Sequence, residues 1–179
     1  MIRKATLDDV SSIQKLVNSH AQKNEMLPRS IGDICDNIRD FFIYEDNGEV
    51  MGCGALHVTW VDLAEIRSLA VAEQSQGKGV GTSLLNVCVN DALQLAIKKV
   101  FALTYKPGFF EKLGFRQVDK SELPHKVWLA CVNCIKFPDC DEVAVIRQLA
   151  ESDEKSIQVS ENGYLNNGFF NTVAAFHIP

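Results

Sequence analysis

A glycine-rich segment between an expected strand and an expected helix constrains this chain most. Residues 76–81, Gln-Gly-Lys-Gly-Val-Gly, follow the apolar-rich run 64–71 and precede apolar residues at helical spacing from Leu84 to Ala96. At such a junction the first backbone N–H groups of the helix have no partner within the helix and can bind an anion. The glycines let that anion approach the backbone, and Lys78 adds a positive charge. The segment therefore predicts a turn that binds a pyrophosphate.

The spacing of these glycines argues against two common nucleotide-binding motifs. The glycines lie at positions 77, 79 and 81, and Thr82 stands where the dinucleotide-binding pattern G-x-G-x-x-G needs its third glycine. The P-loop ending Gly-Lys-Ser/Thr after four variable residues is also missing. Neither ATP nor a dinucleotide is thus the expected ligand.

The order of the elements predicts a mixed α/β sheet flanked by helices. Asn47-Gly48 supplies the positive dihedral angles of a tight hairpin turn between two apolar runs. Thr6 with Asp9, and Ser30, are expected to cap the first two helices. Strands are expected at residues 2–5, 41–44, 49–58, 64–71, 99–104 and 115–118, and helices after residues 6, 30 and 81 and at 107–113.

Length and charge limit the classes of function. A chain of 179 residues can bury one sizeable core and is too short for two ordinary domains. With 18 Lys and Arg against 23 Asp and Glu, the net charge of −5 argues against a nucleic-acid partner. No apolar run approaches membrane-spanning length, and no signal-peptide pattern follows Met1. We expect a cytoplasmic protein with no membrane partner, and the sequence leaves open whether it forms a homodimer.

The six cysteines fall into two groups. Cys35, Cys53 and Cys88 sit singly in apolar stretches and are expected to be reduced core residues. Cys131, Cys134 and Cys140 form a cluster with His125 upstream. Three soft ligands and a histidine would suit zinc, but one C-x-x-C with a more distant third cysteine favours reduced thiols or a redox pair over a zinc site. The metal content is left open.

At the glycine loop the chain resembles the GNAT acetyltransferases. Gln76, Gly79 and Gly81 match the family's Q/R-x-x-G-x-G/A motif, and residues 109–115 are similar to its late helix and strand, which read roughly F-Y-x-x-x-G-F. The resemblance covers about residues 1–120. It implies a GNAT fold, with a mixed, mostly antiparallel sheet that is splayed at the acetyl-CoA site. We assign residues 1–150 to one such domain and residues 151–179 to a C-terminal extension of unknown role.

The same resemblance implies acetyl-CoA as cosubstrate and direct transfer of its acetyl group to an amine. In that mechanism the deprotonated amine attacks the thioester carbonyl, whose oxygen is polarised by a backbone N–H group. The residues that it implies for binding acetyl-CoA are Leu69, Ala70, Val71, Gln76, Gly77, Lys78, Gly79, Val80, Gly81, Thr82 and Phe110.

The catalytic candidates are Glu65, Tyr105 and Ser68. Phe110 stands where many family members carry a tyrosine that protonates the leaving thiolate, and a phenyl ring cannot donate a proton. We predict that Tyr105 protonates the thiolate; the alternatives are that water does so or that the thiolate leaves without a proton donor. Tyr105 can instead be an aromatic residue that only packs at the end of the strand. Glu65 is the candidate base that accepts a proton from the amine. Its alternative interpretation is an ordinary solvent-facing carboxylate. Ser68 can hydrogen-bond the substrate or simply fill the strand.

A closer resemblance concerns the acceptor amine. Residues 27–30, 64–71 and 103–104 are similar to the acetyltransferase domain of N-acetylglutamate synthases, especially the short forms without an amino-acid-kinase domain. This implies L-glutamate as acceptor, in the first step of arginine biosynthesis. Its two carboxylates need cationic partners, and the substrate-binding candidates are Arg29, Arg67, Thr104 and Lys106. Another small amine, a protein amine, or a non-catalytic acyl-CoA-binding module are the alternatives.

Overall fold

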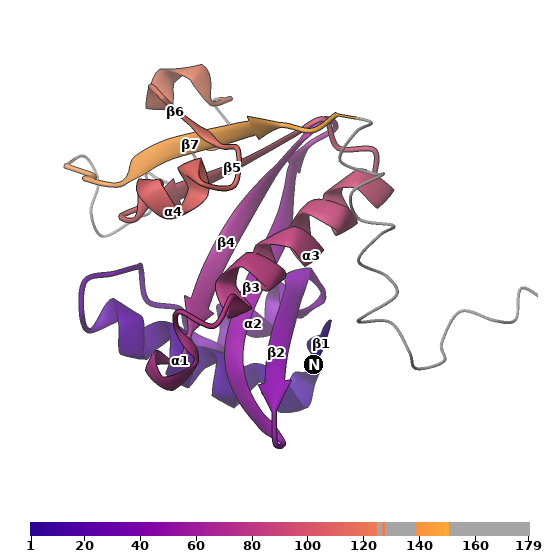
Figure 1. Ribbon diagram of the computed structural model, residues 1–179, viewed down its shortest axis with the longest axis vertical. Coiled ribbons are helices and arrows are strands. Elements are labelled where there is room, and N and C mark those ends of the chain that lie inside the picture. The colour runs from indigo at the N-terminus through magenta and orange to yellow at the C-terminus, as the bar shows by residue number, and fades with distance from the viewer. Residues whose placement is uncertain (125–126, 128–138, 151–179) are drawn as a thin grey trace, which may run out of the picture.

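The computed structural model describes residues 1–124, 127 and 139–150. Its centre is a seven-stranded sheet in the order β1-β2-β3-β4-β5-β7-β6 (Figure 1). Within it β4 and β5 run parallel, while every other neighbouring pair is antiparallel. The strands are β1 (Ile2–Lys4), β2 (Phe41–Asp46), β3 (Glu49–Trp60), β4 (Leu63–Val71), β5 (Lys99–Thr104), β6 (Arg116–Val118) and β7 (Val143–Gln148).

Helices cover both faces of the sheet. The α-helices are α1 (Val10–Ala21), α2 (Ile31–Asp36), α3 (Val80–Gln94) and α4 (Pro107–Glu111), with short 3-10 turns η1 (Leu7–Asp9), η2 (Ile38–Asp40), η3 (Glu73–Ser75) and η4 (Lys120–Glu122). Ile13 of α1 packs in one core cluster with Ala55, and Leu84 of α3 packs in another with Leu56. Consecutive residues of a strand point to opposite faces, so α1 and α3 lie on opposite sides of β3.

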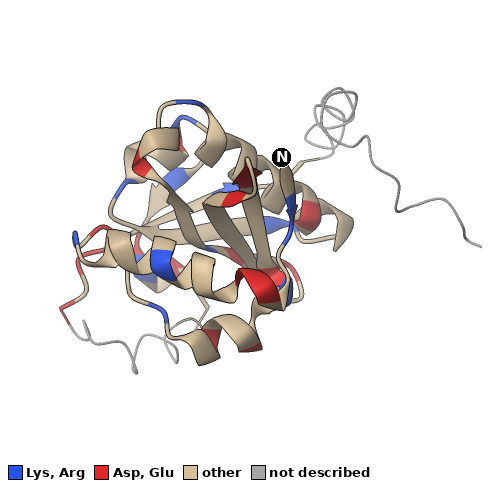
Figure 2. Ribbon diagram, turned by 90° about the horizontal axis from the view of Figure 1, so that it is seen from below, with Lys and Arg blue, Asp and Glu red and all other residues tan. Residues whose placement is uncertain are grey.

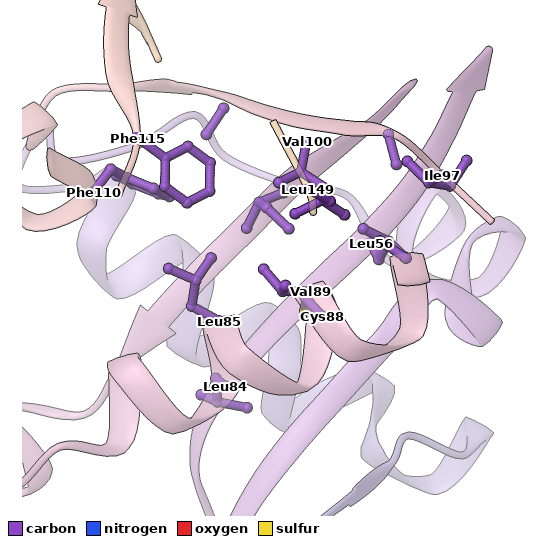
Figure 3. Packing of buried hydrophobic residues seen from close by; sticks show 14 of the residues in the cluster. Leu56, Leu84, Leu85, Cys88, Val89, Ile97, Val100, Phe110, Phe115 and Leu149 are labelled. Carbon is purple, nitrogen blue, oxygen red and sulfur yellow. The ribbon is translucent and has the colours of Figure 1, made fainter. Parts of the chain in front are cut away.

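The core on the α3 side is continuous from one part of the sheet to the other. Leu84, Leu85 and Cys88 of α3 are fully buried and pack against the strands (Figure 3). Leu56 of β3 and Val100 of β5 belong to the same cluster, so α3 joins strands on both sides of β4. This packing holds the start of α3 in a fixed place relative to the end of β4.

Local signals in the sequence account for the starts of these elements. Asn47 and Gly48 have φ angles of 49° and 80°, which confirms the predicted hairpin turn between β2 and β3. The Ser30 hydroxyl accepts a hydrogen bond of 3.1 Å from the Asp33 N–H group, as expected of a helix cap. The Asp9 carboxylate accepts from the Thr6 N–H group at 2.8 Å, which is the predicted variant of the capping box.

The sheet opens where β4 and β5 part. The two strands pair only from Leu63 to Glu65, opposite Lys99 to Phe101. Beyond this point β5 continues to pair with β7 on its other side, and β4 continues to pair with β3. Figure 1 shows β4 and β5 diverging from their shared end. The predicted fold class, including a sheet splayed at this place, is therefore confirmed.

Strand β7 was not predicted. It lies between β5 and β6, whereas the sequence analysis ended the sheet with residues 115–118. The predicted core cysteines are confirmed: Cys53 and Cys88 are fully buried free thiols, and burial raises the pKa of both to about 12. Cys35 is half-buried and also free. In the part of the chain described, no helix is both long and apolar enough to cross a membrane.

Candidate active site

A cavity of about 1030 Å³ lies where β4 and β5 separate. The connector between α1 and α2, β4, the loop before α3, and the residues after β5 all contribute to its wall. Of the residues predicted from sequence, those that line it are Arg29, Glu65, Arg67, Ser68, Leu69, Val71, Gln76, Gly77, Gly79, Val80, Gly81, Thr82, Thr104, Lys106 and Phe110. Ala70, Lys78 and Tyr105 are not among the lining residues.

One end of the cavity is the start of α3. Gly79 is the N-cap of α3 with a φ angle of 81°, and Gly77 also lies in the left-handed region at 72°. No side chain in the described part of the chain caps this helix, so its first N–H groups are available to a ligand in the cavity. The Gln76 side chain donates to the Val71 carbonyl at 3.0 Å and ties the loop to the end of β4. This geometry suits a pyrophosphate.

A β-bulge shapes the middle of β4. Cys53 pairs with Ala70 and Ala55 with Arg67, so Gly54 of β3 faces both Ser68 and Leu69. Ser68 has a φ angle of 51°, and such a conformation costs a non-glycine residue about 1–3 kcal/mol. β5 has already diverged here, and Ser68 and Leu69 both line the cavity, while the Ser68 carbonyl accepts from the Cys53 Sγ atom of β3 at 3.4 Å. The bulge thus lies at the point where the sheet is open.

Glu65 and Arg67 form an ion pair on the wall of the cavity. The Arg67 Nε atom donates to the Glu65 Oε2 atom at 2.6 Å. Glu65 is only 9% exposed, so it is not the ordinary solvent-facing carboxylate that its alternative interpretation supposed. The two residues alternate along β4 and therefore share one face of the sheet. Their contact fixes the direction of a buried carboxylate just where β4 and β5 begin to part.

A polar bridge crosses the gap between β4 and β5. It consists of His20, Glu25 and Lys106, which all line the cavity. His20 Nε2 lies 3.0 Å from the Val71 carbonyl oxygen at the end of β4, and His20 Nδ1 lies 2.6 Å from a Glu25 carboxylate oxygen. Lys106, just after β5, contacts the other Glu25 oxygen at 2.8 Å. Lys106 therefore has a carboxylate partner already, which the substrate would have to share.

The geometry of the polar bridge also defines its charges. The hydrogen bond from Lys106, and then that from His20, lowers the pKa of Glu25 to about 2, so this carboxylate is ionised at neutral pH. The two ring nitrogens of His20 face the Glu25 carboxylate and the Val71 carbonyl oxygen, so the ring joins this carboxylate to the end of β4. The sequence analysis missed His20 and Glu25, because their only signal is a polar pair at the end of a helix.

Arg29 is held by its neighbours. Asn18 accepts from the Arg29 N–H group at 2.9 Å and donates to the Arg29 carbonyl at 3.1 Å. The Arg29 guanidinium pairs with Asp33 at 3.0 Å, one helical turn further on. The side chain thus lines the cavity from a fixed backbone, although part of its charge is used by Asp33.

An aromatic wall stands on the side of α4. Phe110 is 5% exposed and makes edge-to-face contacts with Phe109 and Phe115, each at 5.2 Å between ring centroids. Phe109 and Phe110 both line the cavity, where they provide an apolar surface. Tyr105 is half-buried, and its role as proton donor stays a prediction.

Further lining residues lie in the turn after β6 and in the segment before β7. Lys120, Cys140 and Glu142 line the cavity from the side of β6 and β7. Cys140 is thus the described member of the predicted cysteine cluster, and His125, Cys131 and Cys134 lie outside the described residues. Where the structure describes the chain, no group of three metal-ligating side chains gathers. The zinc hypothesis gains no support.

Comparison with known proteins identifies the family. The profile of the Acetyltransferase (GNAT) family matches residues 7–115. An uncharacterised N-acetyltransferase of Chlorobaculum tepidum is 39% identical over 148 residues, which are 83% of this chain and 96% of that protein. An amino-acid acetyltransferase of Mycobacterium tuberculosis is 33% identical over 131 residues, which are 72% of this chain and 75% of that enzyme.

Two solved structures show how related folds bind ligands. The N-acetylglutamate synthase of Neisseria gonorrhoeae, complexed with coenzyme A and N-acetyl-glutamate, matches with a TM-score of 0.75 and 28% identity. The match covers 84% of this chain and 35% of that one. A Mycobacterium tuberculosis protein in complex with CoA and NLQ matches with a TM-score of 0.72 and 28% identity, over 84% of this chain and 99% of that one. With its splayed sheet and its open helix start, the chain belongs to the GNAT acetyltransferase family and is an acetyl-CoA-dependent N-acetyltransferase related to the amino-acid acetyltransferases.

Proposed function

We propose that the protein transfers the acetyl group of acetyl-CoA to the α-amine of L-glutamate, the first step of arginine biosynthesis, in the cytoplasm. The observation that carries this proposal is a single cavity with two different ends. The open start of α3 suits a pyrophosphate, and the other end presents the cations Arg29 and Arg67 beside a buried carboxylate. The resemblance to enzymes named amino-acid acetyltransferase supports an amino acid as the acceptor.

Each group of residues in the cavity has its own role in the proposed acetyl transfer. The first turn of α3, after Gly79, holds the pyrophosphate, and the backbone of Leu69 to Val71 binds the pantetheine arm. Glu65 removes a proton from the acceptor ammonium, directly or through a water molecule, and the amine attacks the thioester carbon. A backbone N–H group at the bulge of β4 polarises the carbonyl oxygen. The C–S bond breaks, and Tyr105 or water protonates the thiolate. We assign this activity to a domain of residues 1–150.

An assay of thiol release from acetyl-CoA against a panel of amino acids tests the acceptor. We expect turnover above background with L-glutamate and weaker turnover with uncharged amino acids, because an acidic acceptor can pair with the cations of the cavity. Turnover with another amine and none with L-glutamate would replace the acceptor and leave the acetyltransferase assignment in place.

The second candidate is a domain that binds acyl-CoA without turnover. Phe110 is the observation that favours it, because the resemblance implies a proton-donating tyrosine at this place and a phenyl ring cannot donate a proton. Calorimetric binding of CoA, measured beside the thiol-release assay, separates the two functions. Tight CoA binding with no thiol release for any amine in the panel would support the non-catalytic module.

A further inference from the structure

Among the described residues, four Lys or Arg side chains line the cavity, and one differs from the others. Arg29, Arg67 and Lys106 each have a carboxylate partner at 3.0 Å or less. The fourth, Lys120, donates to the Cys140 carbonyl oxygen at 2.8 Å and has no carboxylate partner within the described chain. A carbonyl oxygen satisfies one of the three ammonium donors and neutralises no charge. Lys120 thus keeps ammonium donors that no carboxylate in the described part of the chain contacts, and its charge acts at longer range on the neighbouring Asp119.

Lys120 lines the same cavity as Glu65 and Arg67, but from a different part of the sheet. It opens the turn η4, after β6, and the sheet order puts β5 and β7 between β6 and β4. Leu63 of β4 packs in one core cluster with Leu123, which follows η4. Since Leu63, Glu65 and Arg67 alternate along β4 and share a face, η4 covers the face of the sheet from which Glu65 projects. Glu65 and Arg67 therefore line the cavity from β4, and Lys120 lines it from η4 on the same face of the sheet.

We propose that Lys120 binds the side-chain carboxylate of the acceptor and so sets the preference for an acidic amino acid. This inference rests on the proposed acetylation of L-glutamate. The amine must reach the thioester at the gap beside β4, and the α-carboxylate is bonded to the same carbon as the amine. That carboxylate therefore stays close to Arg67 and Arg29. The side-chain carboxylate extends further from the amine, toward the part of the cavity that Lys120 lines and where its ammonium group has donors to offer.

Lys120 also has a structural role that an experiment must separate from binding. Its hydrogen bond to the Cys140 carbonyl ties the turn after β6 to the segment before β7. Losing that tie would disturb the cavity for every acceptor in the same way. Losing a positive charge that pairs with the side-chain carboxylate would weaken the binding only of acceptors that carry this carboxylate. The ratio between L-glutamate and L-glutamine, which lacks the side-chain charge but keeps the shape, therefore distinguishes the two roles.

The test compares Lys120→Met and Lys120→Arg with the control Lys112→Met in the full chain. Lys112 is exposed, follows α4 and does not line the cavity. For Lys120→Met we expect the KM of L-glutamate to rise about 10- to 100-fold with little change in kcat, since charged hydrogen bonds contribute on this scale. Kinetics with L-glutamine should remain those of the wild type, and Lys120→Arg should recover most of the affinity. Where L-glutamine turns over too slowly, its inhibition constant against L-glutamate takes the place of KM.

An equal change for L-glutamate and L-glutamine, or no change for either, would overturn the proposal. If Lys120→Met fails to fold, Lys120→Gln keeps a donor for the Cys140 carbonyl and gives the same comparison. A wild type that acetylates no L-glutamate would instead refute the proposed function. Normal wild-type turnover with an unchanged KM in the variant would refute the role of Lys120 alone.

Discussion

Glu65 combines burial, a fixed direction and a place at the opening of the sheet. It is the last residue of β4 that pairs with β5, and Arg67 holds its carboxylate at 2.6 Å. A base that takes a proton from the acceptor ammonium must reach the cavity without being surrounded by bulk water, and Glu65 meets both conditions. The burial and the position of Glu65 therefore support its role as the base more strongly than its residue type alone.

We predict that Glu65→Gln lowers kcat by about 100-fold or more, because the amide cannot accept the proton. The amide oxygen can still accept the hydrogen bond from Arg67, so the KM for acetyl-CoA should stay close to that of the wild type. Steady-state kinetics measures both constants. Glu49→Gln, at an exposed position at the start of β3, is the matched control. A loss of kcat no greater than that of this control would rule out Glu65 as the base.

The elements that sequence predicted best have local signals. Asn47-Gly48 defined the hairpin, Ser30 defined the start of α2, and the glycine loop defined the start of α3. Strand β7 had no such signal, because its place between β5 and β6 depends on pairing with residues far away in the chain. The bulge at Ser68 was equally hidden, since a serine with a positive φ angle has no sequence pattern of its own.

The residues of the site fall into the same two groups. The glycine loop and Arg29 lie in short segments that could be recognised in the sequence, whereas the polar bridge joins residues at the end of a helix to the residues after β5. Lys120 likewise reaches the cavity only because β6 and β7 fold back beside β5. Residues brought to a site by long-range pairing leave no periodicity to detect, and they are the ones that the sequence analysis missed.

We predict that Gly79→Ala raises the KM for acetyl-CoA and lowers stability by about 1–2 kcal/mol. A Cβ atom at Gly79 would meet no atom within 4 Å, so the cost comes from the backbone φ angle of 81° rather than from a clash. Relief of that strain would turn the first N–H groups of α3 away from the pyrophosphate. Gly108→Ala, where a Cβ would also meet nothing within 4 Å, is the control and should leave this KM unchanged.

Thermal unfolding and acetyl-CoA titration kinetics measure the two effects of Gly79→Ala separately. A variant that is less stable but keeps the wild-type KM for acetyl-CoA would show that the start of α3 does not hold the pyrophosphate. The comparison with Gly108→Ala removes any general effect of adding a methyl group to a glycine near the cavity.

At the scale of the whole molecule, the sheet has two parts that meet in a short parallel ladder. Strands β1 to β4 form one part and β5 to β7 the other, and the ladder between them has three residue pairs. Figure 2 shows Lys and Arg residues interspersed with Asp and Glu residues along the ribbon. Besides the shared core under α3, the polar bridge connects the two parts across the cavity, from the Val71 carbonyl through His20 and Glu25 to Lys106.

The polar bridge makes the stability of the whole fold depend on pH in the acidic range. Because the folded protein holds the pKa of Glu25 at about 2, against an ordinary value of 4.5, the unfolded chain takes up this proton first as the pH falls. The contribution of Glu25 is therefore complete above about pH 4.5 and is lost as the pH approaches 2. We predict that Glu25→Gln is less stable than the wild type at neutral pH, and that the difference in unfolding free energy shrinks over this window.

Urea unfolding of both proteins at a series of pH values between 7 and about 2 measures that difference. Other carboxylates titrate alike in the two proteins, so subtracting one curve from the other isolates Glu25 and its partners. Glu49→Gln, whose carboxylate is exposed, should parallel the wild type throughout. A difference between Glu25→Gln and the wild type that stays constant from neutral to acid pH would mean that the charge of Glu25 does not hold the two parts of the sheet together.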